Sequence, residues 1–414
     1  MVFIILGIMS CSIVRAQEVS LTLGEAVVIA LRDNRDILLK AEDVKKAKDK
    51  ISEAEAGLFP ALNFTAARSI TQGYYSKDLD QTTTQATLKQ YLYKGGKTMN
   101  TIAQNKYKLT VSEALLEKTK IETILNVKKA FYTLLLTDEL ANLNKGILDN
   151  TKKHLDFIQA RYDSGQASES DMLKIQESLS NVEQVHEASK NQVESGQILL
   201  RNLLYLGDDV KIRPKGQFAY DRIEMAYDEA FLKALEKRPE IKQYEAQENA
   251  DKRAIEIAKA DNRPSIYASW DYYSRSHASL GTAKGWNDYG IIGATFTWPL
   301  FDGWLTRAKV EQAIVDLKTT QLTKEKTVKD IAAELKNSYL ALKDAIAKIK
   351  AAQSQIDLYN DTLSVMRNKY KAGLASLLEL DDASLAYRVA LFNQKQAIYD
   401  YVLAKAKFDK AMGE

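Results

Sequence analysis

The chain has 414 residues, and its 58 Lys and Arg side chains nearly balance its 55 Asp and Glu side chains, for a formal net charge of +3. Domains that bind nucleic acid are usually strongly basic, so this balance argues against a nucleic-acid partner. The single cysteine, Cys11, lies close to the first residue, which excludes a disulfide framework and a cysteine-based metal site in the mature chain.

The first residues have the pattern of an export signal. Residues 2–9 form an apolar run that is too short to cross a bilayer as a helix and is typical of a signal peptide. Val14-Arg15-Ala16 fits a cleavage site, so residues 1–16 are predicted to be a signal peptide. In the alternative interpretation, Ile8-Met9-Ser10-Cys11 is a lipoprotein box and Cys11 is lipidated. Both interpretations place the protein outside the cytoplasm.

The remaining chain contains an internal sequence repeat of two similar units. Glu25-Ala26 and Ala30-Leu31 recur 204 residues later, and Ala86-Thr87 and Gly95 recur 208 residues later. We therefore predict a first repeat over residues 17–205, a linker over 206–224 and a second repeat over 225–414. Each repeat is expected to contain a helix, two strands, a very long helix, a turn and a return helix.

The helices are predicted from charged, periodic stretches that lack proline. The first helices cover about 22–58 and 226–261 and end before Pro60 and Pro264. The predicted long helices cover about 97–163 and 304–371, and the return helices about 168–205 and 376–412. Apolar stripes at three-to-four spacing indicate coiled-coil packing of the long helices. The stripe residues are Ile124, Val127, Phe131 and Leu134 in the first repeat and Ala332, Leu335, Tyr339 and Leu342 in the second.

Four strands in two hairpins are predicted where the apolar period changes to two, clearly at 266–272 and 292–298 and more weakly at 62–66. No stretch after the signal has the roughly 20 apolar residues of a membrane helix, so any span must be built from strands. Aromatic residues crowd both ends of the strands, as at membrane interfaces. They are Tyr74, Tyr75, Tyr272, Tyr273, Trp286 and Tyr289 near the loops, and Tyr91, Tyr93, Trp298, Phe301 and Trp304 at the other end.

A soluble sheet with aromatic edges is the alternative, but no predicted element would cover its apolar face. Small membrane barrels need about eight strands or more, and an open strand edge is not tolerated in lipid. Membrane strands in this chain therefore predict an oligomer that pools strands. A 67-residue helix would extend about 100 Å, so the turns are expected far from the strands.

The turns carry the same motif in both repeats, Tyr-x-x-Gly-x-Ala-Ser. Its residues are Tyr162, Gly165 and Ser168 in the first repeat and Tyr370, Gly373 and Ser376 in the second. Glycine permits the sharp reversal at the end of a helix, and serine is a favourable cap for the next helix.

These features resemble the TolC-like outer-membrane efflux proteins of Gram-negative bacteria, over about residues 20–412. The resemblance is carried by the repeat, the Glu-Ala-x-x-x-Ala-Leu openings, Pro-Leu-Phe-Asp-Gly at 299–303 with its partner Tyr-Leu-Tyr-Lys-Gly at 91–95, and the turns. It implies a mainly α fold with a small β part, two repeats of long antiparallel helices plus β-hairpins. It further implies a homotrimer, in which a 12-stranded outer-membrane β-barrel continues into an α-barrel crossing the periplasm.

The implied function is an exit duct of an efflux or type I secretion system. Such a duct sits in outer-membrane lipid and docks through its turns to a periplasmic adaptor (membrane fusion) protein and an inner-membrane pump of the RND or ABC type. The family narrows the duct with acidic residues, which match Glu379 and Asp382 here. A ring of six carboxylates would favour cations, and mutual repulsion would raise its pKa values.

Capping offers a second interpretation of these acids, because Ser376-x-x-Glu379 and Ser168-x-x-Asp171 both fit a capping box. Asp382 lies outside the box, and its counterpart in the first repeat is Lys174. In relatives, polar links close the aperture, and Tyr370 and Asp171 match the tyrosine and acid of those links. The matching arginine position is Ala375 here, so the closed state is expected either to be weaker or to be held otherwise, for instance through Lys369 or Lys371.

No Gly-rich phosphate loop, His-Glu metal helix or nucleophile elbow is present, so we predict neither enzymatic activity nor a cofactor. The three histidines, His154, His186 and His277, fall on different predicted elements. The competing function is a periplasmic coiled-coil structural or adaptor protein without a membrane span. The cargo, whether drugs, metals or proteins, is left open.

Overall fold

The computed structural model describes residues 18–74, 77–218, 225–279 and 285–414. The predicted signal peptide, with Cys11, and Tyr75 lie outside the described residues. Internal contacts divide the chain into two compact units. Unit 1 comprises the residues up to Leu39, Lys118–Arg238 and Asp330–Glu414, and unit 2 comprises Lys40–Glu117 and Pro239–Lys329.

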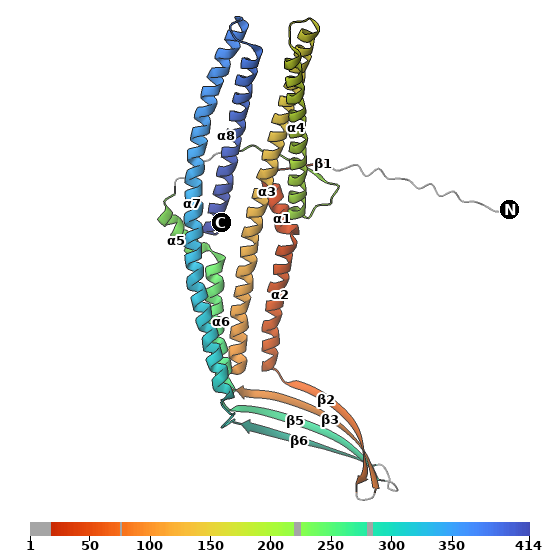
Figure 1. The fold of residues 1–414 in the computed structure, drawn as a ribbon. Coiled ribbons are helices and arrows are strands. Elements are labelled where there is room, and N and C mark those ends of the chain that lie inside the picture. Colours follow the sequence, from red (N-terminus) through yellow and green to blue (C-terminus); the bar gives the residue numbers. More distant parts are fainter. Residues whose placement is uncertain (1–17, 75–76, 219–224, 280–284) are drawn as a thin grey trace, which may run out of the picture. The chain divides into compact units, whose positions relative to one another are not determined.

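Unit 2 holds an antiparallel sheet made from both repeats (Figure 1). Among the described residues, its strands are β2 (Ala61–Tyr74), β3 (Lys77–Lys94), β5 (Ser265–Ser279) and β6 (Gly285–Thr297), in the order β2-β3-β5-β6. The hairpin of each repeat joins the other through β3 and β5. The predicted hairpins are therefore confirmed, and β2 and β6 form the edges of this described sheet.

The two faces of the sheet differ in polarity, as the period-two pattern predicts. On one face Trp270 is opposite Ile292, whose side chain is 84% exposed, and Ile266 is opposite Phe296. On the other face Asp271 Oδ1 accepts hydrogen bonds from Thr87 Oγ1 at 2.6 Å and Gln85 Nε2 at 3.1 Å. The apolar face is thus exposed, whereas polar side chains of the other face hydrogen-bond one another around Asp271.

The long and return helices have nearly the predicted bounds. They are α3 (Lys97–Asp163) with α4 (Glu169–Leu204), and α7 (Leu305–Lys371) with α8 (Leu377–Met412). Within the predicted stripes Val127, Phe131, Leu134, Leu335 and Leu342 are buried, whereas Ile124, Ala332 and Tyr339 are half-buried. A Cβ at Gly196 of α4 would lie 3.3 Å from Leu134 Cδ1, so this glycine permits close approach to α3. None of the helices in the described ranges is long and apolar enough to serve as a transmembrane segment.

The first helix of each repeat is broken, which corrects the prediction of continuous helices over 22–58 and 226–261. Repeat 1 has α1 (Leu23–Asp33) and α2 (Arg35–Glu55), with Asn34 between them, and a 3-10 turn, η1 (Ala56–Leu58), follows. Repeat 2 has α5 (Tyr227–Lys237) and α6 (Pro239–Ala260), with Arg238 between them.

The break has a clear cause in each repeat. Arg238 has ψ of 123 because it precedes Pro239, whose ring disfavours a helical conformation for the residue before it. Asn34 has ψ of 126, and its Oδ1 accepts hydrogen bonds from the backbone N–H of Asp36 at 3.0 Å and of Ile37 at 3.4 Å. Asn34 thereby caps the second helix.

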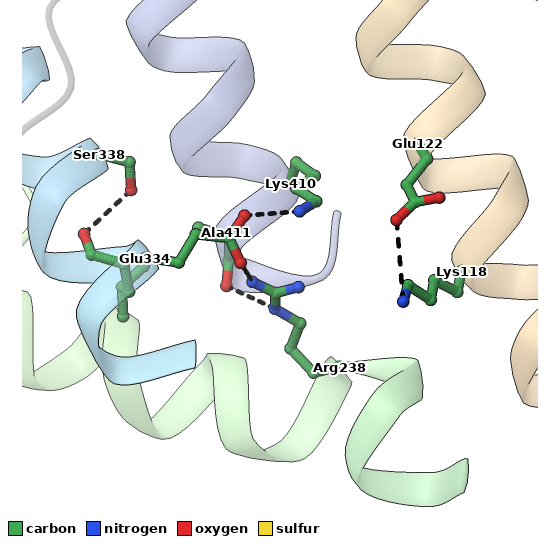
Figure 2. Close-up of polar contacts among 8 residues, drawn as sticks. Lys118, Glu122, Arg238, Glu334, Ser338, Lys410 and Ala411 are labelled. Carbon is green, nitrogen blue, oxygen red and sulfur yellow. Dashed lines mark hydrogen bonds and ion pairs between the residues drawn. The ribbon is translucent and has the colours of Figure 1, made fainter. Parts of the chain in front are cut away.

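The side chains at both breaks also reach the end of the return helix. Asn34 Nδ2 donates to the carbonyl of Leu203 at 3.3 Å, and Arg238 Nε donates to that of Ala411 at 3.0 Å. Figure 2 shows Arg238 pointing from its helix toward Ala411 and Glu334. Glu334 pairs with the Arg238 guanidinium and, through its other oxygen, with Lys410 Nζ at 2.5 Å.

The polar contacts around Glu334 change the pKa of its carboxyl more than its burial does. Burial alone would raise the pKa of its carboxyl, but the hydrogen bond from Lys410 and the charge of Arg238 together lower that pKa. Only 3% of the Arg238 side chain is exposed, so its charge depends on Glu334 and the Ala411 carbonyl for compensation.

A short parallel strand pair in unit 1 was not predicted. β1 (Glu18–Leu21) pairs with β4 (Lys211–Pro214), which lies in the segment assigned to the linker. Leu21 and Ile212 are buried in a core cluster that also contains Val127, Phe131 and Leu200. The connection between the repeats therefore contributes to the core around α3 and α4.

Candidate functional site

The first repeated turn reverses the chain between α3 and α4. Gly165 has φ of 75, a left-handed conformation that is unfavourable for residues with a Cβ. Its N–H donates to Tyr162 O at 2.9 Å, and the N–H of Gln166 donates to Arg161 O at 2.7 Å. These two bonds satisfy carbonyls at the end of α3, as in a Schellman motif.

The second turn repeats this geometry between α7 and α8. Gly373 has φ of 72, its N–H donates to Tyr370 O at 3.0 Å, and the N–H of Leu374 donates to Lys369 O at 2.8 Å. A Cβ at either glycine would meet nothing within 4 Å. Backbone conformation, not space, therefore requires glycine in both turns.

Both predicted capping boxes are present. Ser168 Oγ accepts from the N–H of Asp171 at 3.2 Å and donates to Asp171 Oδ2 at 2.7 Å. Ser376 Oγ accepts from the N–H of Glu379 at 3.3 Å, and Glu379 Oε2 accepts from the N–H of Ser376 at 2.7 Å. Each pair satisfies N–H groups that a helix start would otherwise leave unpaired.

The boxes lower the pKa of both acids. The Ser168 hydroxyl and then its backbone N–H lower the pKa of Asp171, with a smaller effect from Lys174. The backbone N–H of Ser376 and then its hydroxyl lower the pKa of Glu379. Within one chain, Glu379 thus shifts in the opposite direction to that expected for a ring of repelling carboxylates.

A cavity of about 420 Å³ lies next to the first turn, between α3, α4 and α8. Its walls carry Asp171 from α4 and Asp382 from α8, so the fold brings these two predicted site residues together, and Lys174 of α4 lies beside them in the lining. Glu379, Tyr370 and the residues Tyr162, Gly165, Ser168, Gly373 and Ser376 are not among those lining it.

Three further charged or titratable residues line the same cavity and were not predicted as site residues. They are His154 on α3 and Asp381 and Arg388 on α8. His154 Nδ1 lies 3.1 Å from Asp381 Oδ2, and with the Asn150 amide oxygen turned toward it, Arg388 Nη1 donates to Asn150 at 3.0 Å. In the sequence, the only signal for Asp381 is its position beside Asp382.

The described residues provide no metal centre, since they contain no group of three or more His, Cys, Asp or Glu side chains arranged to hold an ion. The arrangement at the cavity is instead one of opposed fixed charges on helices from different repeats. Such an arrangement can influence which ions pass and how the helices separate, without chemistry on a substrate.

Comparison with known proteins gives a consistent pattern. The family model described as "Outer membrane efflux protein" matches residues 26–204 and 231–414. The chain is 21% identical to the alkaline protease secretion protein AprF of Pseudomonas aeruginosa, over 95% of this chain and 85% of AprF. It is 20% identical to the outer membrane protein TolC of Escherichia coli, over 92% of this chain and 80% of TolC.

The fold has a close counterpart among solved structures. The CmeC outer membrane channel of Campylobacter jejuni superimposes with a TM-score of 0.80 at 18% identity, covering 94% of this chain and 85% of CmeC. The match thus includes both the helices and the strands of the described chain.

Proposed function

This chain belongs to the outer membrane efflux protein family, and we propose that three copies of it form the exit duct of a tripartite efflux or type I secretion system. The observation that carries this proposal is the sheet of unit 2, with an exposed apolar face and a hydrogen-bonded polar face. An apolar face suits lipid, and a polar face suits a water-filled lumen.

The edges of the sheet support a trimer. In the described sheet β2 and β6 each have a neighbour on one side only, so their outer N–H and C=O groups lack a strand partner. Lipid cannot satisfy these groups, whereas β6 of one chain can pair with β2 of the next. Three four-stranded sheets then form a closed barrel of 12 strands.

Exposed aromatic side chains support the depth of this barrel in the outer membrane. Trp298, Phe301 and Trp304 are exposed near the ends of the strands that lead into α7, and Trp286 and Tyr289 are exposed near the opposite loop. Such aromatic side chains favour the two interfaces of a bilayer. The continuous helices α3 and α7 then provide the wall of the periplasmic duct.

The duct is passive, and its turns contact a periplasmic adaptor protein, which connects it to an inner-membrane pump of the RND or ABC type. Its relatives include one described as an alkaline protease secretion protein and one described as a pyoverdine export outer membrane protein, which supports more than one class of cargo for this architecture. The pump selects the cargo.

Asp382 is the principal pore acid in this proposal. Its side chain is exposed and lies outside the capping box, whereas the Glu379 carboxylate already accepts from Ser376. Tyr370 and Asp171 contribute to closing the aperture. Glu379 thus acts first as a cap and only secondarily as a pore acid.

The test is the conductance of the full chain in planar bilayers. Asp382→Ala should raise conductance and lower cation preference roughly two- to ten-fold, because each trimer loses three charges at the constriction. Asp361→Ala, at an exposed carboxylate on α7, is the matched control and should change neither. Unchanged selectivity in the Asp382 variant would remove this residue from the pore.

Membrane fractionation tests the proposal as a whole. The chain should be recovered with the outer membrane and released only by detergent. Recovery in the soluble periplasm would instead support the periplasmic coiled-coil adaptor.

A further inference from the structure

Two lysines and two tyrosines gather where the sheet of unit 2 leads into α3. Lys89, Tyr91 and Lys94 come from β3 and Tyr267 from β5, and we call them the lysine–tyrosine cluster. Lys89 Nζ lies 3.8 Å from the centroid of the Tyr267 ring and 4.9 Å from that of Tyr91. Lys94 Nζ lies 4.7 Å from the centroid of Tyr91. Both ammonium groups are therefore held against aromatic faces within a single unit.

The strand register places the cluster on the polar face of the sheet. Tyr91 is opposite Tyr267, and Lys89 is opposite Ser269. Ser269 Oγ donates to Asp271 Oδ2 at 3.2 Å, so these positions share the face on which Asp271 collects its hydrogen bonds. In the proposed barrel this face borders the water-filled lumen, and lipid covers the other face.

An irregularity in β3 brings Lys94 onto the same face. Residues three apart in a regular strand point to opposite sides of the sheet, so Tyr91 and Lys94 would normally be separated. Here the register shifts after Tyr91, where Leu92 is an extra residue, and Lys94 is opposite Ser265, a polar-face position of β5. The bulge thus directs a second lysine toward the first.

The hydrogen-bond donors of the cluster are unused. Within the described ranges, neither Lys89 nor Lys94 forms an ion pair, and none of the four side chains hydrogen-bonds a protein group. Lysines at the nearby starts of α3 and α7 differ, because Lys97 and Lys309 both pair with Asp261, at 2.6 Å and 2.9 Å. The cluster therefore presents ammonium and phenol donors that a ligand can still engage.

The charge at this end of the polar face is positive. Asp271 is the carboxylate beside the cluster, and it accepts hydrogen bonds from three neutral side chains, those of Thr87, Gln85 and Ser269. Two lysine charges thus stand against one carboxylate in each chain. Such an excess attracts anions to the surface that carries it.

The second repeat does not carry these lysines. At the offset of 208 residues, Lys89 corresponds to Thr297 and Lys94 to Asp302. Asp302 has a structural role, because its Oδ2 accepts from the backbone N–H of Thr306 at 2.8 Å at the start of α7. The junction between strand and long helix therefore forms without lysine at either position, and the repeated fold does not explain the cluster.

We propose that the lysine–tyrosine cluster is a binding site for oxyanion groups, such as carboxylates, of small organic anions that pass along the lumen of the barrel. The two ammonium groups and the two phenol hydroxyls bind the anion, and the tyrosine rings hold the lysines in position for it. The proposal deepens the proposed function and rests on it, because the polar face borders a lumen only in the assembled duct.

The site is open to water and is therefore expected to be weak. Lys94 is exposed and Lys89 is half-buried, so solvent and salt screen both charges. Weak binding suits a duct, since a cargo that binds tightly would not leave. Removal of both lysines should weaken the binding of a trivalent anion about three- to thirty-fold.

The experiment measures binding of benzene tricarboxylate to the purified full chain in detergent by calorimetry. Binding should be clear at about 0.02 M salt and should weaken strongly at about 0.5 M, because salt screens the lysine charges. Benzene trimethanol, which has the same ring without the carboxylates, should not bind. In planar bilayers, benzene tricarboxylate added on the loop side should reduce the conductance of the unmodified chain.

Two pairs of substitutions isolate the cluster. The variant with Lys89→Gln and Lys94→Gln should lose binding and block about three- to thirty-fold. The variant with Lys48→Gln and Lys106→Gln removes the same charge from exposed positions of α2 and α3 and should retain both. Tyr267→Phe keeps the ring beneath Lys89 but removes a hydroxyl, so it should lose only about two-fold.

The outcomes separate the site from the duct. A conducting chain that does not bind benzene tricarboxylate would overturn the site alone, as would equal losses in the two double variants. Binding of benzene trimethanol as strong as that of the tricarboxylate would also overturn it. A chain that binds the anion through Lys89 and Lys94 but never conducts would support the oxyanion site and refute the proposed duct.

Discussion

The helix breaks in the two repeats have the same backbone geometry, but the side chain at the break is neutral in repeat 1 and charged in repeat 2. ψ is 126 at Asn34 and 123 at Arg238, and each side chain hydrogen-bonds a carbonyl at the end of its return helix. In repeat 2, the Arg238 guanidinium also pairs with Glu334, which pairs with Lys410. The corresponding positions in repeat 1 are Asn126 and Asn202, so a charged trio replaces a neutral one.

This difference shows that the repeat preserves a hydrogen-bonding role rather than a residue type. A backbone carbonyl at the end of a helix accepts equally well from an amide or a guanidinium. The charged version carries an additional cost, because buried Arg238 must be paired, and an additional sensitivity to pH through Glu334. The neutral version has neither property.

The largest expected loss of stability comes from removing the charged side chain at the break in repeat 2. Arg238→Met should lower the free energy of unfolding by about 3 kcal/mol, because it removes the donor to Ala411 and one partner of half-buried Glu334. Thermal unfolding in detergent, followed by circular dichroism, measures the loss. The control is Lys237→Met, which removes an exposed pair with Glu414 and should cost less than about 1 kcal/mol. Equal losses in both variants would contradict the role of Arg238.

A smaller loss of stability is expected from removing the neutral side chain at the break in repeat 1. Asn34→Ala should cost about 1–2 kcal/mol, because it removes the cap on α2 and the hydrogen bond to Leu203. Asn34→Ser keeps a capping oxygen but is too short to reach Leu203, so it should recover part of the loss. The same unfolding measurement decides between them. If serine were as damaging as alanine, the cap would contribute little.

The smallest expected effect is a change in how stability depends on pH. The pKa of Glu334 is lowered by folding, so its stabilisation is present above the ordinary value of 4.5 and is lost as pH falls through the lower folded value. Glu334→Gln should therefore flatten the acid limb of the unfolding curve below about pH 4.5. Glu325→Gln, at an exposed carboxylate on the same helix, should leave that limb unchanged. An acid limb that is identical in the two variants would exclude Glu334 as its source.

The sequence predicted the long elements well because their signals are local. Proline-free periodic runs placed α3 and α7 within about a residue of their observed ends, and alternating residues placed the hairpins. Pro239 indicated a break at Arg238, but the charged, periodic residues on both sides of it led us to predict one continuous helix. The break at Asn34 had none comparable, because one asparagine within an Ala-, Glu- and Lys-rich run does not by itself stop a helix.

The candidate site was predictable only where its contacts join residues that are close in sequence. The capping boxes join residues three apart, so the Ser-x-x-acid spacing revealed them. His154 and Asp381 are more than two hundred residues apart, and their contact depends on how α8 packs against α3. No local pattern encodes that packing, so His154 could not be assigned a partner from the sequence.

The parallel pairing of β1 with β4 constrains the order in which the chain can complete its fold. Its strands are nearly two hundred residues apart in sequence, and Leu21 and Ile212 close the core around Val127. During export from the amino terminus, β1 arrives first and must wait for the whole of repeat 1 and the connecting segment before it can pair. The first strand of the described chain therefore pairs late, so repeat 1 completes its core only when export has passed the midpoint of the protein.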